Sequence, residues 1–304
     1  MKRLPSVRQL QYLLALHHHQ HFGRAAEACF ISQSTLSASI TNLEEILEAR
    51  LLERDHKTFL FTPLGEAIVL QSRLILEELE TLTDYAQFQG QPMAGIVRLG
   101  CIPTIAPFVL SDIVTAVRTS FPKIQLRLRE DTTDNLLGAV QEGSIDVLLL
   151  ALPYPTSGLH TEILAADAFK QVMHKEWLQQ GFTEDISTWP NESIYLLQRE
   201  HCLTEQALQG CEVKDQQKLH PFFATSLHTL TQMVNSQFGV TFLPQMAIND
   251  GILENTDLIY RNPAPENAHR DIGLAWRTTS SKQTTFLQLA KLIKDIVILK
   301  CKQD

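Results

Sequence analysis

The sequence is short of features that mark several classes of protein. Its 304 residues include only five cysteines, too few for a disulfide-dense secreted scaffold. No window reaches 18 apolar residues, which argues against a transmembrane helix. The first residues lack the apolar segment of a secretory signal, so we expect a cytoplasmic chain with reduced cysteines. A glycine-rich phosphate loop and paired carboxylates at a catalytic spacing are also absent, so we expect neither an enzyme nor a cofactor.

The net charge of −8 argues at first against a nucleic-acid partner, because an acidic chain repels phosphate. The charge is unevenly distributed, however. Residues 1–62 carry seven Lys or Arg and six Asp or Glu, a net charge of +1, which leaves −9 for residues 63–304. The N-terminal segment is therefore nearly neutral, and the overall charge does not exclude DNA binding there.

Residues 1–62 have the pattern of a compact helical domain with helix-turn-helix spacing. Ala25 and Ala26 allow two helices to approach closely, and Ile31 fills the turn. Ser32 is a good N-cap for the helix that follows. This second helix is the one expected to read DNA.

DNA contact is expected from the start of that helix and from a following hairpin. Gln pairs with adenine through two hydrogen bonds, and Ser or Thr reaches bases or phosphates. The helix N-terminus adds backbone amides and the positive end of its dipole. Basic residues of the hairpin can grip the DNA backbone as a wing. The residues expected at the DNA are Ser32, Gln33, Ser34, Thr35, Ser37, Arg54 and Lys57.

Four histidines, His17, His18, His19 and His21, lie close together near the end of the first predicted helix. Metal binding is one interpretation of this tract. No carboxylate or cysteine cluster completes a site, however, so we expect a solvated helix end and no metal.

Residues 63–89 predict one long helix, in which Ile68, Ile75, Leu79 and Leu82 recur close to heptad spacing. A single helix of this length has no domain of its own to pack on, so dimerisation is the expected use. A helix that lies on its own core is the alternative.

After a hinge around Gly90 to Gly95, apolar strands alternate with helices. The order over residues 96–152 is β-α-β-α-β, which implies a mainly parallel sheet flanked by helices. A second unit of this kind is expected to begin near Ala166, and the helix 285–299 closes the chain. The fold class expected is α/β, preceded by an α-rich winged helix-turn-helix and a long linker helix.

These patterns resemble the LysR-type transcriptional regulators. The match includes Ile31-Ser32-Gln33-Ser34-Thr35-Leu36-Ser37 and continues to Gly65. The resemblance implies a winged helix-turn-helix, a dimerising linker helix, and a regulatory domain of two α/β subdomains similar to a periplasmic binding protein. The expected boundaries are 1–62, 63–91 and 92–304, with subdomain I at about 92–165 and 270–304 and subdomain II at about 166–269.

One departure from the family lies in the recognition helix. Thr41 and Asn42 occupy positions at which many relatives carry basic residues. Phosphate contacts supply most of the sequence-independent affinity for DNA. We therefore expect weaker binding per subunit, or a greater reliance on several linked subunits.

Two cysteines have a setting that favours redox chemistry. Cys202 follows a predicted strand and His201, near a helix start where amides and the dipole stabilise thiolate. Peroxide oxidises a thiolate to a sulfenic acid, which condenses with a second thiol. Cys211 is a candidate, but nine helical residues span roughly 13 Å, and disulfide Cα atoms lie within about 7 Å. Bonding would therefore require the helix to unwind or bend. The cysteines without an evident role are Cys29, Cys101 and Cys301.

The run His-Cys-Leu-x-x-Gln-Ala-Leu-x-x-Cys at 201–211 resembles the peroxide-sensing segment of the hydrogen-peroxide sensors within this family. The resemblance implies that Cys202 is the peroxidatic thiol and Cys211 the resolving thiol. It also implies hydroxyls that orient the peroxide and an arginine that favours the thiolate. The residues so placed around the peroxide are Thr104, Thr133, His201 and Arg277. Ordinary helix N-capping is the alternative role for the two threonines.

Three residues depart from the sensor pattern. Glu200 replaces the usual glycine, Thr204 an arginine, and Glu205 an aspartate. A carboxylate at Glu200 would raise the pKa of the Cys202 thiol. We therefore expect a lower peroxide sensitivity than is usual in the family.

The sequence thus predicts a dimeric or tetrameric transcription factor that responds to hydrogen peroxide and regulates antioxidant genes. The implied partners are promoter DNA, further copies of the chain, RNA polymerase and a thiol reductant that resets the disulfide. The alternative is a LysR-type regulator that answers a small metabolite bound between the two regulatory subdomains.

Overall fold

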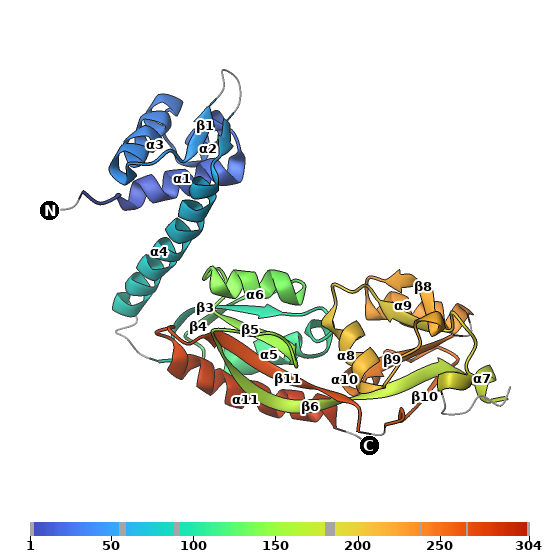
Figure 1. Cartoon of the computed structure of the whole chain (residues 1–304). Coiled ribbons are helices and arrows are strands. Elements are labelled where there is room, and N and C mark those ends of the chain that lie inside the picture. The colour runs from blue at the N-terminus through green and yellow to red at the C-terminus, as the bar shows by residue number, and fades with distance from the viewer. Residues whose placement is uncertain are drawn as a thin grey trace. The chain divides into compact units, whose positions relative to one another are not determined.

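The computed structural model describes residues 3–54, 59–87, 92–179, 186–237, 239–265 and 267–302. The chain forms two compact units (Figure 1). The first contains residues 1–90 and the short segment 141–144, and the second contains residues 91–140 and 145–304.

The first unit begins with the helices α1 (Val7–His19), α2 (Phe22–Ala28) and α3 (Gln33–Leu47). A capping box starts α1, since the Ser6 hydroxyl accepts from the Gln9 amide and the Gln9 side chain accepts from the Ser6 amide. The helices share one apolar core that includes the buried residues Leu13, Leu36 and Ile40. The predicted helical domain is confirmed.

A hairpin and a long helix complete this unit. Strands β1 (Leu52–Arg54) and β2 (Phe59–Phe61) pair antiparallel, and α4 runs over Pro63–Gln87. The predicted hairpin and linker helix are both confirmed. Gly65 is needed at the start of α4, because a Cβ atom there would lie 2.2 Å from the carbonyl oxygen of Leu51.

The second unit is built on a nine-stranded sheet with the order β4-β3-β5-β11-β6-β9-β7-β8, and β10 pairs with β6. The predicted parallel pairing is confirmed for β3 with β4 and β5, whereas β11 is antiparallel to both of its neighbours. The strands are β3 (Gly95–Cys101), β4 (Ile124–Glu130), β5 (Val147–Leu152), β6 (Leu159–His174), β7 (Ile194–Leu197), β8 (Leu219–Ala224), β9 (Val240–Pro244), β10 (Leu258–Arg261) and β11 (His269–Arg277).

Strand β6 is 16 residues long and joins the two halves of this sheet. Its first part pairs with β11, and its second part pairs with β9 and β10. Ala166, where a second unit was expected to begin, lies inside this strand and is paired with Asp271. The sheet is therefore continuous across the two expected subdomains, and their boundaries stay a prediction.

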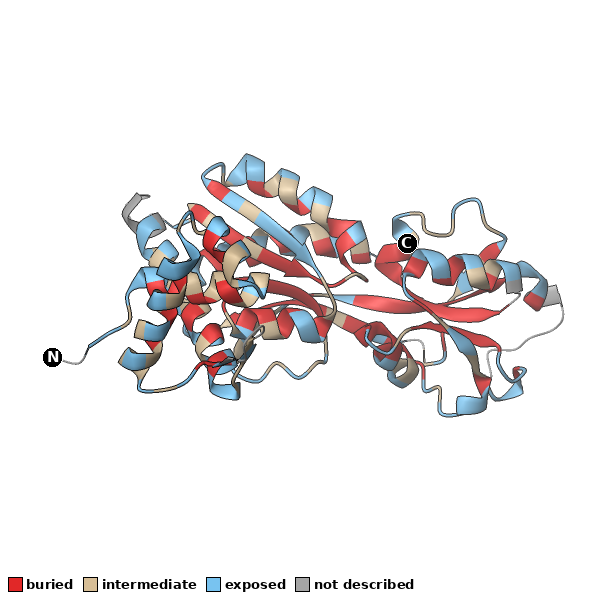
Figure 2. Ribbon diagram, turned by 90° about the horizontal axis from the view of Figure 1, so that it is seen from above, coloured by how far each residue is buried: buried red, intermediate tan, exposed pale blue. Residues whose placement is uncertain are grey.

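Helices cover the strands of the second unit, and the buried residues concentrate along the strands (Figure 2). This arrangement confirms the predicted α/β fold class. No helix in the described ranges is long and apolar enough to cross a membrane. The helices are α5 (Ala106–Ser120), α6 (Thr133–Gln141), α7 (Lys175–Gln179), α8 (Cys202–Gly210), α9 (Leu227–Gln237), α10 (Gln245–Asn249) and α11 (Gln283–Cys301).

Candidate functional site

The N-terminus of α3 presents a row of polar side chains. Ser32 is the N-cap, and its hydroxyl accepts from the Thr35 amide at 3.1 Å. The same hydroxyl lies 2.9 Å from that of Ser34 and 2.7 Å from that of Thr35. Ser32, Gln33, Ser34 and Thr35 are all exposed, and Ser37 is half-buried. The structure thus brings these predicted residues together on one helix start.

The wing residues are only partly described. Arg54 is the last residue of β1, but its side chain and the whole of Lys57 lie outside the described part of the chain. Asn42, one of the departures in α3, accepts a hydrogen bond from Gln9 Nε2 at 2.9 Å. Asn42 therefore ties α3 to α1.

The histidine tract has structural partners. The His21 side chain caps α2 by accepting from the amides of Gly23 and Arg24 at 3.1 and 3.3 Å. His17 Nε2 lies 2.9 Å from Glu66 Oε2. No group of three or more potential metal ligands occurs among the residues that the structure describes.

Cys202 is the first residue of α8, directly after the N-cap His201. The thiol is buried, with 6% of the residue exposed. Burial raises the pKa of the Cys202 thiol, while the Thr133 hydroxyl, the Arg270 guanidinium and the amides of Cys202 and Leu203 lower it. The helix start and its polar neighbours thus partly offset the desolvation of a thiolate.

Cys202 lines a narrow cavity, which leaves no room for a water-sized sphere in this structure. It is lined by Thr104 in the turn after β3, by Thr133 at the start of α6, and by His201. Thr104, Thr133 and His201 are all buried. The structure therefore gathers three of the four residues that the sequence assigned to a peroxide site.

Arg277, the fourth of these residues, does not lie at this cavity, so that assignment is corrected. Its Nη1 atom donates to the carbonyl oxygens of Val140 and Ile145 instead. Arg270 is the arginine beside the cavity, since its Nη1 atom donates to Thr104 Oγ1 at 2.9 Å. The two arginines lie at opposite ends of β11, roughly 23 Å apart at the rise of a strand.

Cys211 lies just past the C-terminus of α8, where its amide donates to the Ala207 carbonyl. The residue is fully buried, and burial raises the pKa of its thiol to about 12. Both Cys202 and Cys211 are free thiols in this structure. The intact α8 holds their Cα atoms roughly 13 Å apart, which is too far for a disulfide.

Two side chains anchor α8. Thr204 is buried and its hydroxyl donates to the Leu197 carbonyl at 2.9 Å. Gln206 Nε2 donates to the carbonyl oxygens of Ala151 and Pro153 at 3.1 and 3.3 Å. Among the sequence departures, Thr204 is thus an anchor of the helix, whereas Glu200 and Glu205 are exposed.

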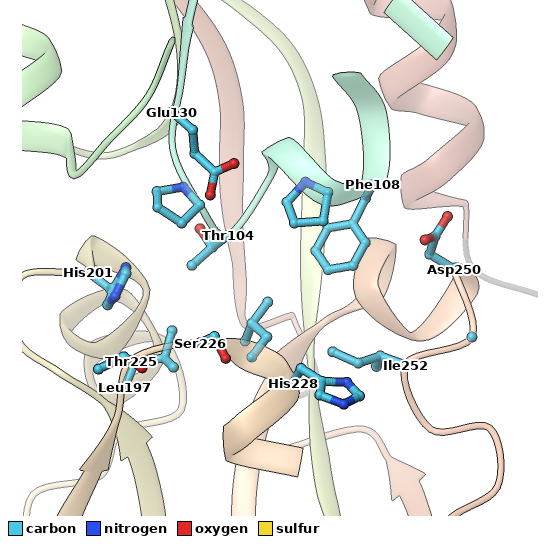
Figure 3. Close-up of a pocket in the computed structure, with 14 residues that line it drawn as sticks. Thr104, Phe108, Glu130, Leu197, His201, Thr225, Ser226, His228, Asp250 and Ile252 are labelled. Atoms are coloured by element: carbon cyan, nitrogen blue, oxygen red, sulfur yellow. The ribbon is translucent and has the colours of Figure 1, made fainter. Parts of the chain in front are cut away.

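A larger cavity adjoins the narrow one (Figure 3). It has a volume of about 460 Å³ and shares Thr104 and His201 with the narrow cavity. Glu130 and Asp250 add carboxylates to its lining, and Ser226 adds a hydroxyl near the start of α9. This volume is within the range of about 300–1,000 Å³ that small ligands occupy.

Comparison with known proteins identifies the family. Residues 7–66 match the bacterial regulatory helix-turn-helix protein, lysR family, and residues 90–296 match the LysR substrate binding domain. The chain belongs to the LysR family. As a LysR-family protein, it is a DNA-binding regulator of transcription, which confirms the family resemblance found in the sequence.

Several relatives of this LysR-family regulator resemble nearly its whole length. The transcriptional regulator EstR of Acinetobacter baylyi is 36% identical over 298 residues, covering 97% of this chain and 98% of EstR. OxyR of Escherichia coli is 34% identical over 307 residues, covering 95% of each protein. The reduced regulatory domain of OxyR2 from Vibrio vulnificus is 46% identical with a TM-score of 0.65, covering 68% of this chain and 97% of that domain.

Proposed function

We propose that this LysR-family regulator senses hydrogen peroxide through a reversible disulfide between Cys202 and Cys211 and so controls antioxidant genes. The observation that carries the proposal is the narrow cavity at Cys202, where Thr104, Thr133 and His201 surround a thiol at a helix start. The similarity to OxyR and OxyR2 supports it.

The surroundings of the cavity indicate whether each threonine hydroxyl can donate a hydrogen bond to peroxide or accept one from it. Thr104 Oγ1 accepts from Arg270, so the Thr104 proton can be donated to a peroxide oxygen. The Thr133 hydroxyl lies beside Cys202 in the lining of the same cavity, so its oxygen can accept from a peroxide O–H. One donor and one acceptor would hold the O–O bond in a single orientation toward the thiol.

The reaction then balances with two thiols and one peroxide. The Cys202 sulfur attacks one peroxide oxygen, the O–O bond breaks, and the other oxygen leaves as hydroxide that takes up the thiol proton to give water. The sulfenic acid formed on Cys202 is attacked by the Cys211 sulfur, which forms the S–S bond and releases a second water. A thiol reductant later returns both sulfurs to thiols by exchange.

The geometry of α8 turns this reaction into a conformational signal. A disulfide cannot span the roughly 13 Å of an intact α8. Bond formation therefore requires the helix to unwind and releases the hydrogen bonds of Thr204 and Gln206. The reduced and oxidised regulators differ in this segment, which is the two-state element that a switch needs.

Exposed apolar residues of α4 support assembly with further copies of the chain. Ile75 and Leu82 are 49% and 62% exposed, and they belong to the heptad positions found in the sequence. We propose that α4 dimerises the regulator, that the α3 helices of a dimer or tetramer contact promoter DNA, and that the oxidised form acts on RNA polymerase.

Peptide mapping of disulfides tests the proposal directly. After stoichiometric peroxide, the wild-type protein should yield a Cys202–Cys211 linked peptide, and Cys202→Ser should not. Cys101→Ser is the matched control, because Cys101 is also a buried thiol of the second unit and should not affect the linkage. A wild-type protein that keeps both thiols free after peroxide would contradict the proposal.

A small metabolite is the second candidate signal, favoured by the larger cavity of about 460 Å³. In that case a ligand would bind between Glu130, Ser226 and Asp250, and the thiols would be bystanders. Cys202→Ser would then keep the wild-type transcriptional response, which separates this candidate from the peroxide sensor.

A further inference from the structure

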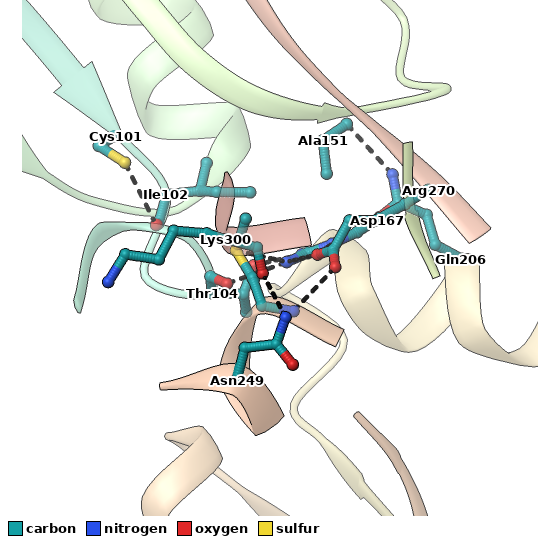
Figure 4. A network of polar contacts seen from close by, with 10 residues as sticks. Cys101, Ile102, Thr104, Ala151, Asp167, Gln206, Asn249, Arg270 and Lys300 are labelled. Atoms are coloured by element: carbon teal, nitrogen blue, oxygen red, sulfur yellow. Dashed lines mark hydrogen bonds and ion pairs between the residues drawn. The ribbon is translucent and has the colours of Figure 1, made fainter. Parts of the chain in front are cut away.

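A buried ion pair lies next to Thr104, one of the residues that line the narrow cavity (Figure 4). Asp167 of β6 and Arg270 of β11 are both fully buried. The Nε and Nη2 atoms of Arg270 donate to Asp167 Oδ2 at 3.1 and 3.0 Å. Burying two charges costs free energy unless the remaining donors and acceptors also form hydrogen bonds. The other contacts of this pair are therefore part of what keeps it stable.

Those contacts come from three further segments of the chain. Asp167 Oδ1 accepts from the Met246 amide at 3.0 Å, and the buried Cys301 thiol lies beside this carboxylate. Arg270 donates to Thr104 twice, to its hydroxyl at 2.9 Å and to its carbonyl oxygen at 3.0 Å. The pair is therefore linked to the cavity through Thr104 and to the C-terminal helix through Cys301.

The end of α11 is itself held firmly in place. Asn249 Nδ2 donates to the carbonyl oxygens of Lys300 and Lys302 at 2.9 and 2.7 Å. Lys300 Nζ lies 2.9 Å from Asp250 Oδ1. These bonds cap the last turn of α11 and fix the position of Cys301 against Asp167.

The charge of Arg270 reaches the thiol of Cys202. Its guanidinium lowers the pKa of Cys202, in opposition to burial. Inside a protein one charge acts strongly on every group nearby, because the effective dielectric constant is well below that of water. The carboxylate of Asp167, which contacts the same guanidinium, must weaken this effect.

We propose that Asp167 is a positioning residue for the peroxide reaction: it fixes Arg270 on Thr104 and neutralises much of the arginine charge that acts on Cys202. Cys301 supports this role by holding the carboxylate. The inference rests on the proposed peroxide chemistry, and it assigns the C-terminal helix a part in setting how sensitive the regulator is.

Other titratable groups face Cys202 from neighbouring elements. They are Glu130 at the end of β4, Tyr154 after β5, Glu200, His201, and the more distant Asp134, to which Tyr154 donates. The carboxylates of Glu130, Asp134 and Glu200 are exposed, so water and salt screen them. Asp167 and Arg270, in contrast, are fully buried, and their charges are not screened.

The test measures the alkylation of Cys202 by iodoacetamide in the full-length protein as a function of pH, read by mass spectrometry of the Cys202 peptide. The midpoint is the pH at which the alkylation rate reaches half of its maximum. Asp167→Asn should move this midpoint to lower pH and increase the alkylation rate at pH 7 by about tenfold, equal to one pKa unit. An unchanged or higher midpoint would overturn the proposal.

Asp146→Asn is the matched control. Asp146 is another buried carboxylate of the second unit, and it accepts from the Arg98 amide at 2.8 Å and lies 3.7 Å from Lys282 Nζ. Its replacement removes a similar buried charge away from the cavity. The control should keep the wild-type midpoint, and an equal shift in both variants would contradict a specific role of Asp167.

A double variant keeps the test sharp if Asp167→Asn leaves Arg270 uncompensated and the protein folds poorly. Combining Asp167→Asn with Arg270→Gln replaces the ion pair by two neutral amides, a change that buried pairs often tolerate. Adding Asp167→Asn to Arg270→Gln should then leave the midpoint in place. If Asp167→Asn lowers the midpoint of the Arg270→Gln protein as much as it lowers that of the wild type, Asp167 acts without the arginine. That result would overturn the proposal.

Cys301 is tested by two substitutions at one position. Cys301→Ser keeps a hydrogen-bond donor and should retain the wild-type midpoint, whereas Cys301→Ala should shift it in the same direction as Asp167→Asn, by less. Equal behaviour of the two would remove Cys301 from the proposal. Alkylation involves no peroxide, so a failure of the peroxide-sensing function and a failure of this inference give different results.

Discussion

Gln206 ties helix α8 to the end of strand β5, because its Nε2 atom donates to the carbonyl oxygens of Ala151 at 3.1 Å and Pro153 at 3.3 Å. The side chain is buried, and its Oε1 atom has no hydrogen-bond partner among the residues that the structure describes. The tie exists only while α8 is folded, so in the proposed switch it stabilises the reduced form and not the disulfide form.

Gln206→Leu should therefore make the disulfide harder to reduce. Loss of bonds present only in the reduced form costs that form about 1–2 kcal/mol, which lowers the reduction potential by about 20–40 mV for a two-electron couple. Titration against glutathione buffers measures the potential. Gln283→Ala, which removes a side-chain bond to Thr278 far from α8, is the control and should leave the potential unchanged.

The two arginines of β11 should differ in their effect on peroxide. Arg270→Gln removes the cation that favours the Cys202 thiolate and should slow oxidation by about tenfold. Arg277→Gln, which removes bonds to Val140 and Ile145, should stay within about twofold of wild type. Stopped-flow measurement of thiol loss gives both rates, and thermal unfolding reports any loss of fold. Equal rates for the two variants would restore Arg277 to the site.

The error over these arginines shows where sequence reasoning ends. Side chains alternate along a strand, so Arg270 falls on the same face as the buried residues Ile272 and Leu274. Arg277 is seven residues further and faces the other way. The alternation was readable in the sequence, but the resemblance to a family favoured the arginine at the strand end.

Cys202 could be found from a local pattern, namely a helix start directly after a strand. Thr104 came only from the resemblance to the peroxide sensors of the family. Asp167 was not accessible in this way. It lies inside β6, among residues that read as an ordinary buried strand, and its partner Arg270 is 103 positions away in the sequence. A contact of that kind depends on the pairing of β6 with β11, which no local pattern specifies.

Glu200 is expected to slow the sensor by a small, salt-dependent amount. Its carboxylate lines the narrow cavity but is exposed, so solvent screens its effect on Cys202. Glu200→Gln should raise the oxidation rate about two- to threefold at low ionic strength and by less at about 0.5 M salt. Glu205→Gln, at an exposed position in the first turn of α8, is the control. A gain that survives high salt would indicate a steric rather than an electrostatic role.

Cys211 should make the fold sensitive to alkaline pH. An unfolded thiol ionises near pH 8.5, whereas burial raises the pKa of Cys211 to about 12 in the folded chain. The raised folded value means that stability is complete below pH 8.5 and is lost as pH rises toward 12, at about 1.4 kcal/mol per pH unit. Urea unfolding under reducing conditions should show a steeper loss above pH 8.5 for wild type than for Cys211→Ala. Parallel curves would contradict the buried, protonated state.

Gln33 is expected to contribute to sequence specificity rather than to general affinity for DNA. It is exposed beside the N-cap Ser32, and a bidentate contact with adenine is worth about 1–3 kcal/mol. Gln33→Ala should therefore weaken binding to the operator by roughly tenfold or more. It should leave the dependence on salt unchanged, because no phosphate charge is neutralised by this side chain. Gel-shift titrations on operator and unrelated DNA at several salt concentrations measure both quantities, with Gln125→Ala in the second unit as the control. Equal weakening on both DNAs would assign Gln33 to the backbone instead of the bases.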